Sequence, residues 1–121
     1  KCRLASINEF VGNADEIYFA TLQGAKVVQG IYPEKWPFIE GNFKIRKLLK
    51  GSLQEENVTL TTGLGGGDCG ISMFVSATYV IFKNAKNNAI GACGGSSVIE
   101  SFQEDEIEQK IKKILNAEMK K

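Results

Sequence analysis

Apolar residues follow two patterns along the chain: short runs rich in β-branched and aromatic residues, typical of β-strands, and stretches with helical spacing. Runs rich in β-branched and aromatic residues predict strands over 16–28, 43–51, 57–63, 71–75, 78–85 and, more weakly, 89–94. Gly24 predicts a bulge or sharp bend inside the first run, and the phase shift at Leu48-Leu49 predicts another near the end of the second. The stretch 29–41 holds both prolines and the single tryptophan, so it is predicted to be a loop or hairpin excursion.

Two segments have helical spacing instead. In 5–14, Ser6 and Glu9 form a candidate capping box, and the apolar stripe consists of Ile7, Phe10, Val11 and Ala14. In 101–119, Ser101 and Glu104 give the same start signal, and the apolar stripe consists of Ile107, Ile111, Ile114, Leu115 and Met119. The fold class is therefore mainly β with flanking α: five or six strands with a short N-terminal and a C-terminal helix. A small closed or partly open barrel would bury such strands without long exposed edges.

Composition limits the function. The 121 residues are expected to form one domain, and the net charge of +1 gives no electrostatic case for nucleic acid or a membrane surface. No apolar run approaches the length of a membrane helix, so no span is expected. The chain contains no histidine, which excludes Ser-His-Asp and Cys-His nucleophile activation and His-containing zinc sites. We expect a monomeric non-enzyme with no metal and no cofactor.

The segment GLGGGDCG (63–70) contains a formal G-x-G-x-x-G at Gly65, Gly67 and Gly70. A dinucleotide site needs a helix directly after these glycines, but the residues that follow are β-branched and aromatic without helical period. Two other interpretations stay open. The segment is a flexible connection between strands, or its glycines let the backbone pass close to another molecule while Cys69 fastens the loop.

Three features in order along the chain resemble the netrin-like module of the tissue inhibitors of metalloproteinases. They are an opening Cys2 with a short helix and Ala14-Asp15 before the first long strand, FKIRKLLKG (43–51), and DCGISMFVSATYVIF (68–82) with Cys93 downstream. The resemblance implies a five-stranded OB-fold barrel with flanking helices. It assigns 1–100 to this domain and leaves 101–121 as an amphipathic helix expected to pack on it.

The same resemblance implies a disulfide arrangement. Mature chains of that family begin C-x-C, so Cys2 corresponds to the second cysteine and is expected to pair with Cys93. Cys69 would then pair with a cysteine immediately before Lys1, which this sequence does not contain. An odd number of cysteines is consistent with this arrangement. The alternative is that Cys69 is a free, buried thiol.

In the family, the α-amino group and carbonyl of the first cysteine chelate the catalytic zinc of the protease. The implied protease-contact residues are Lys1, Cys2, Arg3, Leu4, Gly66, Gly67, Asp68, Cys69 and Gly70. Lys1 would enter a specificity pocket that is often apolar, which departs from the family pattern. The implied function is a secreted, periplasmic or cell-surface protein-binding module, with a zinc metalloprotease as the candidate partner. A lipid anchor before Lys1 is compatible with this interpretation.

A rival function uses a basic strand face. Lys44, Arg46, Lys47 and Lys50 could bind glycans or other polyanions, as OB barrels do, or serve solubility and edge protection. Polyanion binding would weaken steeply with salt. A third interpretation is an adhesion or structural domain.

Two smaller features complete the candidates. The aromatic side chains of Tyr32, Trp36 and Phe38 could contact a partner or cap one end of a barrel. Asn57-Val58-Thr59 is a glycosylation sequon, which has a meaning only in a eukaryotic secretory pathway.

Overall fold

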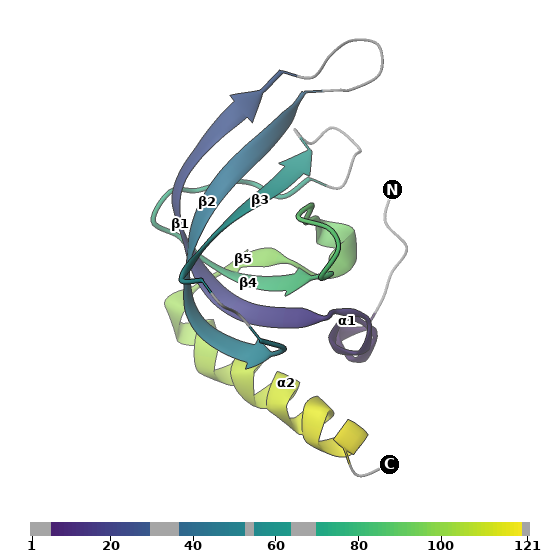
Figure 1. Ribbon diagram of the computed structural model, residues 1–121. Helices are drawn as coiled ribbons and strands as arrows, with labels where there is room; N and C mark the ends of the chain where they lie inside the picture. Colours follow the sequence, from purple (N-terminus) through teal and green to yellow (C-terminus); the bar gives the residue numbers. More distant parts are fainter. Residues whose placement is uncertain (1–5, 30–36, 53–54, 64–69, 120–121) are drawn as a thin grey trace.

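One antiparallel sheet organises the chain (Figure 1). The computed structural model describes residues 6–29, 37–52, 55–63 and 70–119. Its sheet has the strand order β3-β2-β1-β4-β5 and consists of β1 (Glu16–Val28), β2 (Phe38–Lys50), β3 (Asn57–Gly63), β4 (Thr78–Lys83) and β5 (Ser97–Ile99). The helical elements are α1 (Ile7–Asn13), α2 (Glu104–Met119) and the 3₁₀ turns η1 (Ala92–Gly94) and η2 (Ser101–Gln103).

The predicted class, mainly β with a helix near each end, is confirmed. The strand order leaves β3 and β5 at the two edges, and no ladder joins these two strands in the described part of the chain. A parallel bridge, Thr61 to Ala89, links β3 to the segment after β4. There the amide of Thr61 donates to the carbonyl of Asn88 (2.9 Å), and the amide of Ile90 donates to the carbonyl of Thr61 (2.7 Å). Closure of the OB barrel stays a prediction.

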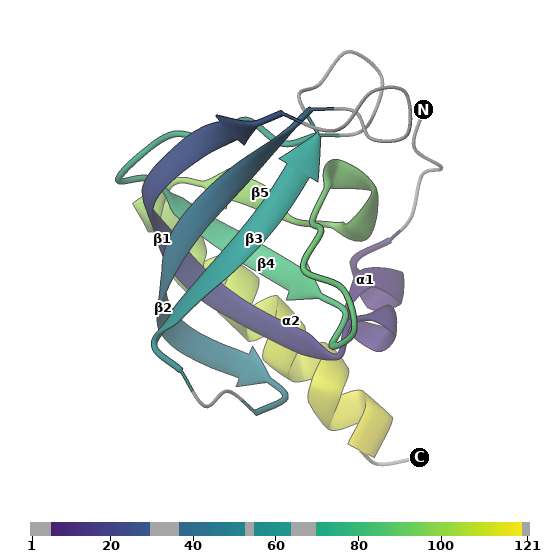
Figure 2. The same ribbon diagram turned by 45° about the horizontal axis from the view of Figure 1, so that its top comes forward.

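Alternation along β1 divides the core into two clusters, one on each face of the sheet. Figure 2 shows α2 lying across the outer face. Tyr18, Ala20 and Leu22 face the inside of the curved sheet. Ile17 and Phe19 face the opposite side, where α1 and α2 pack. Ile111 of α2 is fully buried in this second cluster, because its helical stripe lies on the sheet.

Both predicted strand irregularities are confirmed. The β1–β2 register shifts between Leu22 and Gly24. It shifts again near the end of β2: Ile17 pairs with Lys50 and Tyr18 with Leu48, so Leu49 has no partner in the register. The N-terminal helix also begins as predicted: the Ser6 hydroxyl accepts a hydrogen bond from the amide of Glu9 (3.3 Å). In the C-terminal segment, a short 3₁₀ turn precedes α2. There the side chain of Gln103, not of Glu104, reaches back to an amide, that of Glu100 (2.8 Å).

Three strand predictions were wrong. The second strand begins at Phe38 instead of residue 43, because Phe38–Asn42 pairs with the distal half of β1. Residues 71–75 are not a strand: the hydroxyl of Tyr79 donates to the carbonyl of Ser72 (2.6 Å) and accepts from the amide of Phe74 (2.7 Å). The predicted strand over 89–94 contains only the bridge at Ala89 and the turn η1, and β5 follows it at 97–99.

A glycine-to-alanine pair tests the packing of α1 against the segment after η1. Gly95 has φ +96°, and a Cβ there would lie 2.6 Å from the ring of Phe10. We expect Gly95→Ala to lower the free energy of unfolding by about 2–3 kcal/mol, because the left-handed conformation and the clash both add strain. Gly94→Ala is the matched control, since a Cβ there meets no atom within 4 Å. Equal urea midpoints for the two variants would contradict this packing.

Candidate protein-binding site

The predicted contact residues lie mostly outside the described part of the chain. Lys1, Cys2, Arg3 and Leu4 precede the described residues, and Gly66, Gly67, Asp68 and Cys69 fall in the gap at 64–69. Gly70 is described and partly exposed. The structure therefore constrains this site through the elements that flank it.

The two ends of segment 64–69 are held close together. Before it, Gly63 pairs with Phe38 at the end of β3. After it, the amide of Ile71 donates to the hydroxyl of Thr62, which is buried, at 3.1 Å. The two bonds of the Tyr79 hydroxyl then fix residues 72–74, and burial raises the pKa of this phenol. The described residues on the two sides of segment 64–69, Thr62 and Ile71, are therefore in direct contact.

The segment 1–5 leads into a helix that is firmly packed. Phe10 of α1 lies against Phe82 of β4, with ring centroids 5.8 Å apart. The ammonium group of Lys50 donates to the carbonyl of Val11 at 2.7 Å, which satisfies one of the free carbonyls at the end of this short helix. These contacts fix the position of α1 on the sheet.

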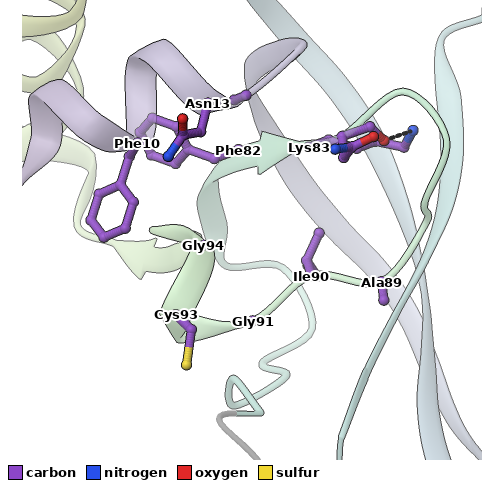
Figure 3. A pocket seen from close by; sticks show the side chains of 11 residues that line it. Phe10, Asn13, Phe82, Lys83, Ala89, Ile90, Gly91, Cys93 and Gly94 are labelled. Atoms are coloured by element: carbon purple, nitrogen blue, oxygen red, sulfur yellow. Dashed lines mark hydrogen bonds between the residues drawn. The ribbon is translucent and has the colours of Figure 1, made fainter. Parts of the chain in front are cut away.

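Cys93 belongs to η1, and its sulfur points away from Phe10 and α1 (Figure 3). It is disulfide-bonded, and it lines a cavity of about 490 Å³ together with Phe10 and Asn13 of α1, Phe82 of β4 and Ile90 (Figure 3). The other cysteines, Cys2 and Cys69, are outside the described residues. Pairing of Cys93 with Cys2 stays a prediction, and so does the partner of Cys69.

The four predicted basic residues do not form one free face. Arg46 lies 3.6 Å from a carboxylate oxygen of Glu104, and Lys47 lies 2.7 Å from one of Glu108. Lys50 bonds the end of α1, as described above. Lys44 is exposed on the adjoining part of β2. A polyanion at this strand would have to compete with the carboxylates that α2 supplies, which the sequence did not indicate.

The Lys47–Glu108–Lys112 cluster predicts a pH effect. Hydrogen bonds from Lys112 and Lys47 hold the pKa of the Glu108 carboxyl below its usual value. A depressed pKa adds stability above the unfolded-state value, about 4.3, and loses it as pH falls through the lower folded value. We expect Glu108→Gln to flatten the acid limb of a stability–pH curve measured by urea unfolding. An unchanged acid limb would contradict the cluster's contribution.

The remaining candidates are dispersed. Tyr32 and Trp36 fall outside the described residues, and Phe38 begins β2 with its side chain partly exposed. Asn57 of the sequon is exposed at the start of β3. The hydroxyl of Thr59 donates to the amide oxygen of Asn42 at 3.0 Å.

Sequence reasoning missed a buried polar group at one end of β1 and β4. The Lys83 ammonium, almost fully buried, lies 3.6 Å from the Glu16 carboxylate and donates to the carbonyl of Asn84 (3.1 Å). The nearby Tyr18 hydroxyl is buried with no hydrogen-bond partner in the described structure, and burial and the Glu16 charge raise its pKa. Glu16 and Lys83 are directly opposed in the β1–β4 register, which only the pairing of the strands reveals.

Comparisons with known proteins assign no family. No protein-family model matches the chain, and no curated protein matches it. Over the described residues, no cluster of three or more His, Cys, Asp or Glu side chains is placed to bind a metal ion. None of the described helices is long and apolar enough to cross a membrane.

Proposed function

We propose that this chain is a secreted, periplasmic or cell-surface protein-binding module of the tissue-inhibitor type, without enzymatic activity, whose candidate partner is a zinc metalloprotease. Its contact ridge would combine Lys1–Leu4 with Gly66–Gly70. The observation that carries the proposal is Cys93: it is disulfide-bonded and shares a cavity with Phe10, on the helix that directly follows residues 1–5. A bridge from Cys93 to Cys2 would tie the ridge to this helix.

The proposed mechanism is rigid docking. A disulfide at Cys93, the packed helix α1 and the anchored base of segment 64–69 would hold the ridge before a partner arrives. Little ordering entropy would then be lost on binding. Zinc chelation in the manner of the family would also need a cysteine with a free α-amino group before Lys1. The open coordination position of the protease zinc would receive that amine.

Inhibition of a zinc metalloprotease panel tests the proposal. The chain, produced with a cysteine before Lys1, is titrated against each enzyme with a fluorogenic peptide substrate. The expected result is inhibition that persists at high salt, is abolished by acetylation of the terminal amine and falls at least tenfold in Asp68→Ala. Lys113→Ala, on the exposed side of α2, is the matched control and should inhibit like the parent chain.

Two results would contradict the proposal. One is the absence of inhibition and binding across the panel by a chain whose disulfides have formed. The other is binding that acetylation leaves unchanged and that weakens steeply with salt, which would favour a polyanion ligand instead.

A further inference from the structure

Among the residues that the structure describes, the distal half of β1 has one edge without a strand partner. The β1–β4 register ends at Thr21–Thr78, and Leu22 makes the last bonds on that side, to Ser76 and Ala77. Beyond the bulge, Gly24–Val28 pairs with β2 along one edge. None of the described strands pairs with the opposite edge of these residues. We call these five residues the free β1 edge.

The free β1 edge borders a three-stranded part of the sheet. Its partner, Phe38–Asn42 of β2, pairs in turn with β3, so three strands carry it. The two ribbon views agree that this end of β1 and β2 projects past β4 and β5 (Figures 1 and 2). At about 3.3 Å per residue, five residues offer roughly 16 Å of edge.

Its surroundings leave room for another chain. Ala25 and Lys26 are exposed, and Val27 is 55% exposed although it is apolar. A Cβ at Gly24 would meet no atom within 4 Å. An open strand edge presents backbone N–H and C=O groups in the spacing that an extended chain matches.

We infer that the free β1 edge binds an extended segment of a partner protein by strand addition, with a carboxylate side chain facing Lys26. Lys26 is the one charged residue of this edge, and its side chain is 72% exposed. The Glu40 carboxylate, across on β2, lies 3.6 Å away in an exposed pair, an arrangement that contributes little. The ammonium is therefore available to an incoming carboxylate, while Val27 offers apolar contact on the other face.

The charge disfavours a second copy of the chain as the occupant. An antiparallel pair of identical edges centred on Lys26 would set two ammonium groups directly opposite each other, and like charges in that position are destabilising. A lysine on an exposed edge is also a known protection against self-pairing. An acidic strand of a different protein meets neither obstacle.

Strand addition at this edge uses none of the residues of the proposed contact ridge. It therefore stands whether or not the chain inhibits a protease. The test below also contains no protease, so the failure of one proposal is distinguishable from the failure of the other.

The probe is a phage-displayed library of random twelve-residue peptides, selected against the whole oxidised chain and counter-selected against Lys26→Glu. We expect selected peptides to combine β-branched residues with at least one Asp or Glu. A synthetic copy of the best peptide should slow amide hydrogen exchange and shift the NMR signals of Gly24–Val28. Lys26→Glu should weaken its binding at least fivefold, and replacing the peptide's acid by lysine should restore binding to that variant.

Lys113→Glu is the matched control, because it makes the same charge change at an exposed site on α2. It should bind the peptide like the parent chain. The inference is overturned if no peptide binds below 1 mM, if the shifted signals lie away from Gly24–Val28, or if Lys113→Glu weakens binding as much as Lys26→Glu. Concentration-dependent dimerisation that protects this edge would overturn it as well, in favour of a second copy.

Discussion

Replacing Phe43 with alanine is expected to lower the free energy of unfolding by about 3–5 kcal/mol. The side chain is fully buried inside the curved sheet and meets Tyr79 edge-to-face, with ring centroids 5.3 Å apart and planes at 89°. Removing it loses apolar burial, leaves a cavity and deprives Tyr79 of a favourable ring contact. Urea unfolding followed by circular dichroism measures the change.

Phe102→Ala is the matched control, since its side chain is 80% exposed on η2. It should change stability by less than about 0.5 kcal/mol. A loss below 1 kcal/mol for Phe43→Ala, or equal losses for the two variants, would contradict the inner core cluster described above.

Removing the disulfide of Cys93 is the second large expected effect. If Cys93 pairs with Cys2, Cys93→Ser should lower the free energy of unfolding by about 4 kcal/mol, because a long loop is no longer closed in the unfolded chain. Cys2→Ser should cost the same, and the double variant no more than either single one, since both remove one bond. Cys69→Ser should add its own, separate effect to that of Cys93→Ser.

Non-additivity between Cys69→Ser and Cys93→Ser would contradict this pairing. Those two residues would then be the bonded partners, and residues 1–5 would not be tied to the cavity beside α1. The cycle is measured by urea unfolding of the oxidised variants.

The sequence predicted the elements whose pattern is carried locally. β1 was predicted with its observed bounds, 16–28, because its β-branched and aromatic run is continuous. The bulge at Gly24 and the cap at Ser6 followed from single residues whose conformational preferences are strong. The long C-terminal helix followed from its apolar stripe.

Elements that depend on distant partners were missed. Phe38–Asn42 contains Gly41 and follows a proline, so it has no local strand signal; pairing with β1 and β3 makes it a strand. Residues 71–75 have strong strand composition, yet two of their backbone groups bond the Tyr79 hydroxyl instead of a ladder. No local sequence pattern reveals that a side chain takes the place of a neighbouring strand as their hydrogen-bond partner.

The candidate site was predicted unevenly for the same reason. Lys44, Arg46, Lys47 and Lys50 predicted a basic strand face. The sequence does not show that α2 folds back and places Glu104 and Glu108 against that strand. The free β1 edge escaped notice because an edge is a property of the whole sheet. Both features require knowing which strands and helices are neighbours.

A disulfide map of the naturally produced protein, kept unreduced and read together with its intact mass, tests the proposed function most directly. We predict a Cys2–Cys93 bridge, with Cys69 bonded to a cysteine before Lys1 whose α-amino group is free. A Cys69–Cys93 bridge, or a blocked amine on that first cysteine, would contradict inhibition by zinc chelation at the N-terminal ridge.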